Sequence, residues 1–300
     1  MAVQVVTDPV GTGASDVDLG RTRGRVLKSL LHNPMGLVGM GLLFVVVVIA
    51  VFAPLLAPYP PAEVHFETPF QRVGTEGFWL GTDDLGRDIM SRAFYGTRAS
   101  LQVGLLSVAL AILVGAPLGL VSGYWSWLDS IVSRLTDLML AFPFLIIAVG
   151  LAAINGASLG NAAIALGIAQ IPTMIRVVRA ETLQWKEADF IRSARAFDAS
   201  STRILGQHIL PNTAAAIIVQ ATVIMPVSII GEATLSFLGL GITPPASSLG
   251  IMLSDAQQYI FRSPAAAVIP GLAIVIICLA FNFFGDALRD ALDPTTSSSK

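Results

Sequence analysis

The chain has 300 residues, of which 54% are hydrophobic and 13% are charged, and its mean hydropathy is +0.74. It is far more apolar than a soluble domain requires for its core, so the composition places it in a membrane. The net charge of -2 argues against nucleic acid as a partner, and the single Cys278 excludes an internal disulfide framework or a cysteine metal cluster.

Six stretches are apolar enough to cross a hydrocarbon core, which takes roughly 20 helical residues. They are residues 36–56, 101–121, 138–154, 159–175, 213–231 and 265–284. The third and fourth are short, but their flanks extend them as helices, through Arg134 and Asp137 and through Arg176 and Arg179. We expect an all-α, polytopic membrane protein with six transmembrane helices. A re-entrant or core helix is the alternative for the fourth stretch.

Basic residues set the expected orientation, because they collect in cytoplasmic loops. With the N-terminus inside, only five of the 18 lysines and arginines face outward: Arg72, Arg87, Arg92, Arg98 and Arg262. We therefore expect both termini in the cytoplasm and the first span to be a retained signal anchor. The expected parts are an N-terminal tail (1–35), a first transmembrane helix (36–57), an extracytoplasmic loop with an interfacial element (58–100), a core transmembrane domain (101–290) and a C-terminal tail (291–300).

Opposed charges and glycines fill residues 80–92, just before the second span. Asp83, Asp84 and Asp88 lie beside Arg87 and Arg92 in the sequence. We expect a compact, salt-bridged element with a structural role; contact with a substrate is the alternative.

The second span carries glycines at four-residue intervals, Gly115, Gly119 and Gly123. Such spacing lets another helix approach closely, and we expect packing within the chain, with a contact to another subunit as the alternative. Pro143, Pro172 and Pro226 lie within predicted spans, and we expect them to kink those spans.

A charged segment, residues 181–212, separates the fourth and fifth spans. Within it, Phe190, Ile191, Ala194 and Phe197 fall at helical spacing on one face. A short helix here is expected to lay an apolar ridge into a groove on a soluble partner.

Polar residues of the same segment complete the candidate contact. Arg192, Arg195 and Arg203 point away from the apolar face and are expected at the rim of the contact. Asp198 tolerates a turn conformation, and we expect its side chain to cap the helix that follows.

Glu232 is a carboxylate near the outer end of the fifth span, where a charge is costly unless it is paired, protonated or hydrated. A structural or interfacial role is expected. A gate residue that meets a binding protein or a substrate amine is the alternative.

The sequence offers no catalytic machinery of its own. It contains no phosphate-binding Gly-x-x-x-x-Gly-Lys-Ser/Thr loop, so an energy source must lie in another polypeptide. Residues 156–160 match Gly-x-Ser-x-Gly, but they lie in an outer turn without a strand-to-helix elbow or a nearby histidine, which argues against a hydrolase.

The 181–212 segment ends in His208-Ile209-Leu210-Pro211-Asn212 and resembles the cytoplasmic coupling loop of ABC importer permeases. In that family the loop carries Glu-Ala-Ala and then Gly, and it docks on the ATPase subunit. Here Arg192-Ser193-Ala194 and Asp198 stand at those positions. Residues 80–101, 231–250 and 282–294 resemble the C-type permease subunits of dipeptide, oligopeptide and nickel importers.

This resemblance implies a non-catalytic permease of a bacterial cytoplasmic membrane, in an ATP-driven importer for dipeptides or short oligopeptides. It implies four kinds of partner: a second homologous permease, two ATPase subunits or domains, an extracytoplasmic substrate-binding protein and the lipid bilayer. No cofactor is expected in this chain, since ATP and Mg would be bound by the ATPases. The alternatives are a nickel-chelate or haem importer of the same family, and an ion-coupled carrier or channel.

Overall fold

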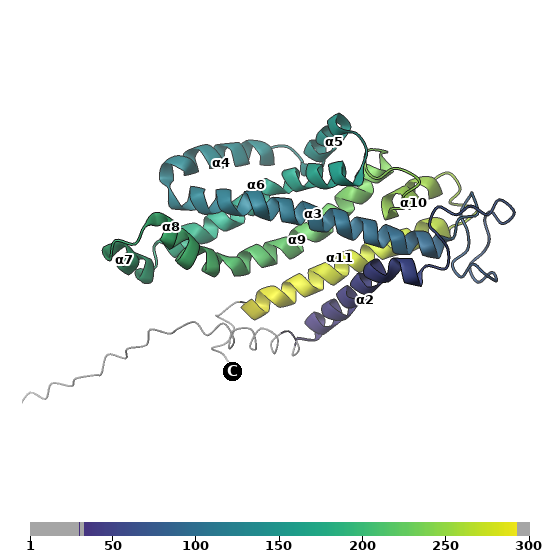
Figure 1. Cartoon of the computed structure of the whole chain (residues 1–300), viewed down its shortest axis with the longest axis horizontal. Coiled ribbons are helices and arrows are strands. Elements are labelled where there is room, and N and C mark those ends of the chain that lie inside the picture. The colour runs from purple at the N-terminus through teal and green to yellow at the C-terminus, as the bar shows by residue number, and fades with distance from the viewer. Residues whose placement is uncertain (1–29, 31–32, 293–300) are drawn as a thin grey trace, which may run out of the picture.

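The computed structural model describes residue 30 and residues 33–292, so most of the expected N-terminal and C-terminal tails lies outside the described residues. The described part is built from helices, with two isolated β-bridges in one loop (Figure 1). Five of its helices are long and apolar enough to cross a membrane, and a bent pair makes a sixth candidate. The five contain α2 (Pro34–Leu56), α3 (Ile89–Tyr124), α6 (Leu159–Lys186), α9 (Leu210–Phe237) and α11 (Ala265–Leu292).

Capping side chains fix where the first two spans begin. Asn33 accepts hydrogen bonds from the backbone N–H groups of Met35 and Gly36, and proline occupies the first position of α2. Asp88 accepts from the N–H and the hydroxyl of Ser91 at the start of α3. These contacts satisfy donors that the first helical turn leaves without an intrahelical partner.

The second span begins twelve residues earlier than its apolar run predicts, at Ile89 instead of 101. The extra turns carry Ser91, Arg92 and Thr97, which hydropathy reads as loop but which are buried in the fold. The segment that the sequence assigned to a loop is therefore partly the first turns of α3.

The glycines of α3 pack against α6, as the spacing predicts. A Cβ added at Gly115, Gly119 or Gly123 would stand within 2.6–2.8 Å of a side-chain atom of Met174, Val178 or Thr182. Only glycine leaves room for this approach, so these three glycines allow the backbone of α3 to lie directly against the side chains of α6.

The third predicted span is broken. Helices α4 (Ser126–Leu140) and α5 (Phe144–Asn155) meet at 87°, and the three residues between them, Ala141, Phe142 and Pro143, are exposed. Proline lacks the N–H that would continue the ladder, which explains why α4 ends here. The prediction of a kink at Pro143 is confirmed, but the bend is far sharper than in a kinked continuous helix. At Pro172 and Pro226 the chain stays helical, within α6 and α9.

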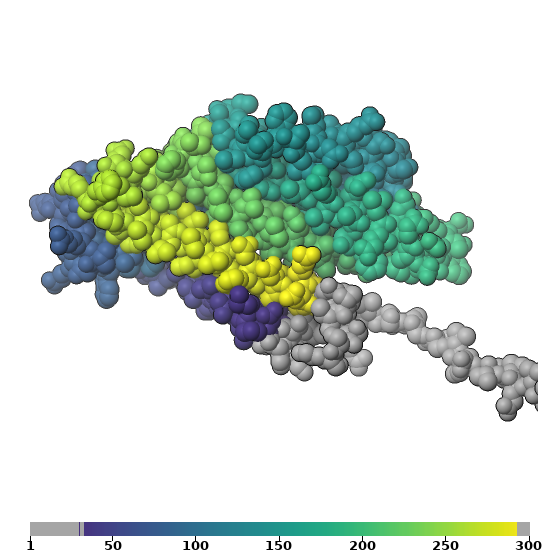
Figure 2. Space-filling view, turned by 180° about the vertical axis from the view of Figure 1, so that it is seen from behind, coloured from purple at the N-terminus to yellow at the C-terminus, as the bar shows by residue number. Residues whose placement is uncertain are grey.

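The two ends of the bundle carry different elements (Figures 1 and 2). One end holds α7 (Asp189–Ala196), α8 (Ser201–Arg203) and a π-helical turn (Ile204–Ile209) that runs on into α9. The other end holds the loop between α2 and α3 together with α10 (Leu249–Ala256). The candidate sites predicted from the sequence therefore lie at opposite ends of the molecule.

Candidate functional site

Helix α7 is held between the ends of two long helices. The ring of Phe190 lies 6.1 Å from that of Trp185 in the last turn of α6, and 6.4 Å from His208 in the π-helical turn before α9. Ile191 is fully buried in the main core beneath α7. Helix α7 therefore contacts both the end of α6 and the turn that leads into α9.

The four residues of the predicted apolar ridge do not form one free surface. Ile191 is buried and Ala194 is partly buried against the core, so both hold α7 in place. Phe190 is 43% exposed, whereas Phe197 is 87% exposed at the end of the helix. The surface open to a partner is narrower than the spacing predicts, and it centres on Phe197.

Asp198 adopts the left-handed conformation expected of it, with φ of 58°. Its side chain does not cap the next helix, contrary to the prediction. That cap is Ser200, whose hydroxyl accepts from the N–H of Arg203 at 3.4 Å. Asp tolerates this backbone conformation better than most residues, which accounts for its standing where the related loops have glycine.

The three arginines differ in what they contact. The guanidinium of Arg195 lies over the ring of Tyr124, 5.3 Å from its centre, and is thus engaged within the chain. Arg192 forms long contacts with Glu187 and Asp189 at 3.6 and 3.8 Å and stays exposed. Arg203 donates to Gln207 at 3.0 Å. Arg192 and Arg203 therefore remain open at the surface.

A hollow of about 460 Å³ lies beside Phe197 at this end of the molecule. It is lined by Ala194, Phe197, Asp198, Ala199, Ser200, Arg203 and His208. It joins an exposed aromatic ring to polar groups, the composition found at the centre and rim of protein interfaces.

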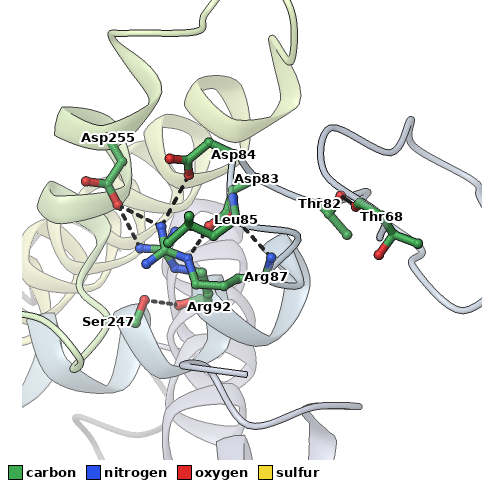
Figure 3. A network of polar contacts seen from close by, with 9 residues as sticks. All are labelled: Thr68, Thr82, Asp83, Asp84, Leu85, Arg87, Arg92, Ser247 and Asp255. Atoms are coloured by element: carbon green, nitrogen blue, oxygen red, sulfur yellow. Dashed lines mark hydrogen bonds and ion pairs between the residues drawn. The ribbon is translucent and has the colours of Figure 1, made fainter. Parts of the chain in front are cut away.

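At the opposite end, a buried ion-pair network closes the loop before α3 (Figure 3). Asp83 is 1% exposed and accepts from the backbone N–H of Leu85 at 3.0 Å and of Arg87 at 2.9 Å. Its second oxygen accepts from Nε of Arg87 at 2.6 Å and from the guanidinium of Arg92. The salt-bridged role expected of this segment is confirmed.

The network also includes Asp255 on α10, which sequence reasoning missed. Its carboxylate accepts from Arg87 at 3.3 Å and from Arg92 at 3.0 Å, and so joins the outer loop to α10. Asp255 is more than 160 positions away, and no local pattern marks it as a partner. Residues 80–92 already contain three aspartates for two arginines, so their composition does not call for a further acceptor.

Electrostatics keep this network charged. Burial alone would lower the pKa of Arg87, but the carboxylates of Asp83, Asp255 and Asp84 outweigh it, and the pKa is raised. For the nearby phenol of Tyr259, burial and then Asp84 and Asp83 raise the pKa above its ordinary value. Both groups therefore hold their protons throughout the neutral range.

Glu232 is fully buried within the protein. One carboxylate oxygen accepts from Ser100 of α3 at 2.6 Å and the other from Ser236 at 2.8 Å. The hydroxyl of Ser236 in turn accepts from the N–H of Ile242 at 3.2 Å. Glu232 thus connects α3, α9 and the loop that leads to α10, which agrees with the structural role expected of it.

A helical bundle with five candidate spans, a broken sixth and a short helix projecting at one end is the architecture of a polytopic membrane protein. Residues 111–298 match the family of binding-protein-dependent transport system inner membrane components, and residues 23–72 match the N-terminal transmembrane domain of oligopeptide transport permease C. The chain belongs to this family and is a permease subunit of an ABC importer.

Named relatives are similar over most of the chain. A dipeptide transport system permease of Alkalihalophilus pseudofirmus is 44% identical, covering 90% of this chain and 89% of its own. A glutathione transport system permease of Pectobacterium atrosepticum is 43% identical, covering 85% of this chain and 86% of its own.

A solved structure shares the fold. The MetNI methionine ABC transporter in an inward-facing conformation matches with a TM-score of 0.58 at 19% identity. The match covers 68% of this chain and 98% of the solved chain. At this identity the likeness supports the architecture alone.

Proposed function

We propose that this chain is the permease subunit of an importer for dipeptides or short oligopeptides. Support comes from the relatives, which transport dipeptides at 44% and 40% identity and glutathione, itself a short peptide, at 43%. Nickel chelates and haem gain no support from these relatives. An ion-coupled carrier is excluded by membership of the permease family.

In the proposed assembly a second, homologous permease completes the translocation path. An extracytoplasmic binding protein delivers the peptide, and two ATPase subunits or domains bind ATP and Mg in the cytoplasm. Both termini and the 181–212 segment face the cytoplasm. The basic residues support this orientation, since they favour the cytoplasmic side.

The proposed coupling to the ATPases rests on the contacts of α7. Phe197 is exposed above a hollow of about 460 Å³, while Ile191 and Phe190 connect α7 to α6 and α9. A partner that binds Phe197 would therefore act on both α6 and α9. ATP binding would close the ATPases and shift α7, and the permease pair would switch to face outward; hydrolysis would reset it.

This coupling has a thermodynamic condition. The two permease states must hold the ATPases with different affinity, since a partner that binds both equally shifts neither. Coupling is also reciprocal, so a permease state favoured by the loaded binding protein must in turn favour the closed ATPases.

Uptake of a radiolabelled dipeptide tests the proposed function. Cells that lack this chain should lose saturable uptake at low substrate concentration, and the wild-type gene should restore it. Labelled nickel uptake is measured in the same strains. Normal dipeptide uptake without the chain, or loss of nickel uptake alone, would overturn the peptide assignment.

A further inference from the structure

Arg98 lies in α3, the helix that contains the second candidate span. In the part of the chain that the structure describes, it forms no ion pair or side-chain hydrogen bond, whereas Arg87 and Arg92 nearby are fully engaged. The N–H of Tyr59, just after α2, donates to the hydroxyl of Ser91 and marks the outer end of both helices. Arg98 lies seven residues further along α3, about 10 Å toward the membrane.

Arg98 stands at one end of a groove between α2 and α3 with a volume of about 380 Å³. This volume falls within the range of roughly 300–1,000 Å³ that ligand sites occupy. The groove is lined by Val47, Ala50, Val51, Arg98, Leu101, Gln102, Leu105, Met225 and Phe281. Arg98 and Gln102 are the only polar side chains in this lining.

A charge in this position requires an anionic partner, because an uncompensated guanidinium is costly inside a membrane. The apolar side chains on the other walls of the groove favour contact with hydrocarbon chains. The groove also opens between apolar surfaces, where Val51 is 60% and Leu105 is 64% exposed. A cation at one end of an apolar channel fits an anionic amphiphile.

A peptide in transit fits the groove poorly. Its ammonium group and its amides would need acceptors, and the lining offers no carboxylate and a single amide side chain, that of Gln102. Their burial without partners would be unfavourable. The composition of the lining therefore favours a lipid over a transported peptide as the occupant of the groove.

We propose that this groove is a binding site for an anionic phospholipid. The phosphate of the headgroup accepts hydrogen bonds from Arg98, with the amide of Gln102 as a second donor. One acyl chain lies along Val47 and Val51 of α2 and Leu101 and Leu105 of α3. The lipid would thereby fill the space between the first span and the rest of the bundle.

Photo-crosslinking tests the site in the transporter purified with its partner subunits and reconstituted into nanodiscs. The probes are phosphatidylglycerol and phosphatidylcholine, each with a photoreactive group in one acyl chain, and mass spectrometry locates the crosslinks. Phosphatidylglycerol should label peptides with residues 47–51 and 101–105. It should exceed phosphatidylcholine about fivefold, the factor expected for one basic side chain near an anionic surface.

Three variants separate the contribution of the Arg98 charge from that of the space in the groove. Arg98→Gln should reduce this preference to about one, whereas Arg72→Gln, which removes a charge from the outer loop, should leave it unchanged. Val51→Trp keeps Arg98 but fills the groove, and it should reduce labelling by both probes. Val51 is already exposed, so the larger side chain fits without crowding the core.

The opposite results overturn the proposal. These are equal labelling by both probes in the wild type, labelling elsewhere only, or unchanged preference in Arg98→Gln. Crosslinks displaced by the transported peptide would assign the groove to substrate. Crosslinks to Arg98 from the second permease would assign it to a subunit interface.

Discussion

Ser100 on α3 donates a hydrogen bond of 2.6 Å to the carboxylate of Glu232 on α9, across 132 positions of sequence. The other oxygen of the same carboxylate accepts from Ser236, so one side chain joins two spans and the start of the loop between α9 and α10. This carboxylate lies fully inside the fold, and its partners are hydroxyl groups.

Glu232→Ala should destabilise the chain by about 2–3 kcal/mol, because it removes two hydrogen bonds to a buried acceptor and leaves a cavity. Glu232→Gln should cost far less, since its amide can still accept from Ser100 and donate to Ser236. Thermal unfolding of the purified protein in detergent measures both. Equal loss in the two variants would contradict the proposed structural role.

Asp83→Asn should destabilise the outer loop by about 3 kcal/mol, because a buried arginine pair loses its principal acceptor while Asp255 remains. Asp84→Asn is the matched control. Asp84 is exposed and reaches Arg87 only at 3.4 Å, so its loss should cost less than about 1 kcal/mol. Hydrogen exchange of residues 66–86 reports the difference, and similar protection in the two variants would refute it.

Gly119→Ala should weaken the contact between α3 and α6. The added Cβ would stand 2.7 Å from Cβ of Val178, which forces the helices apart and costs about 1–3 kcal/mol. Gly41→Ala, in the interior of α2, meets nothing within 4 Å and should not lower stability. Thermal unfolding midpoints of the two variants test this, and equal midpoints would contradict the prediction.

Phe197→Ala should leave the chain stable and impair its attachment to the ATPase, because the ring is exposed here and would be buried in the complex. A loss of about 3 kcal/mol at that contact is expected. Ala194→Asp should be at least as harmful, since it places an unpaired charge beside the contact. Ile191→Ala should instead lower membrane abundance, because Ile191 is fully buried.

Co-purification of the ATPase and dipeptide uptake, each normalised to membrane abundance, separate these effects. Full ATPase binding and uptake by Phe197→Ala and Ala194→Asp at normal abundance would disprove the coupling role of α7. Because abundance is measured independently, a folding defect cannot imitate that result.

Cysteine labelling tests the proposed orientation in a background without Cys278. An impermeant reagent applied to intact cells should label Glu67→Cys in the outer loop and leave Ser201→Cys at the start of α8 unlabelled. Lysed cells, in which both should react, provide the control. Labelling of Ser201→Cys in intact cells would reverse the topology.

The spans were predictable because apolar runs follow directly from the hydrocarbon thickness. Five of the six runs fall inside single long helices, whose ends are displaced by polar turns, as at Ile89. Hydropathy failed there because buried polar residues such as Arg92 acquire partners only through tertiary contacts. The 87° bend beside Pro143 was beyond sequence reasoning, since proline predicts a kink without its size.

The candidate site was predictable in position but not in detail. Helical spacing placed α7 correctly, yet the predicted ridge joins Ile191, which is buried in the core, to Phe197, which follows the last helical residue and is exposed. Periodicity does not distinguish an intramolecular contact from an intermolecular one. Asp255 was missed for a related reason, because its partners are defined only when α10 packs against the loop.

The break between α4 and α5 gives the molecule a preferred direction within the plane of the membrane. Asp137 pairs with Arg176 at 3.2 Å, which places the break, four residues later, near the middle of α6. Irregular backbone at that depth is tolerated only against protein or water. Figure 1 shows α2 on the opposite edge of the bundle. The edge with the break is therefore expected to face protein or water, and the edge with α2 is expected to face lipid.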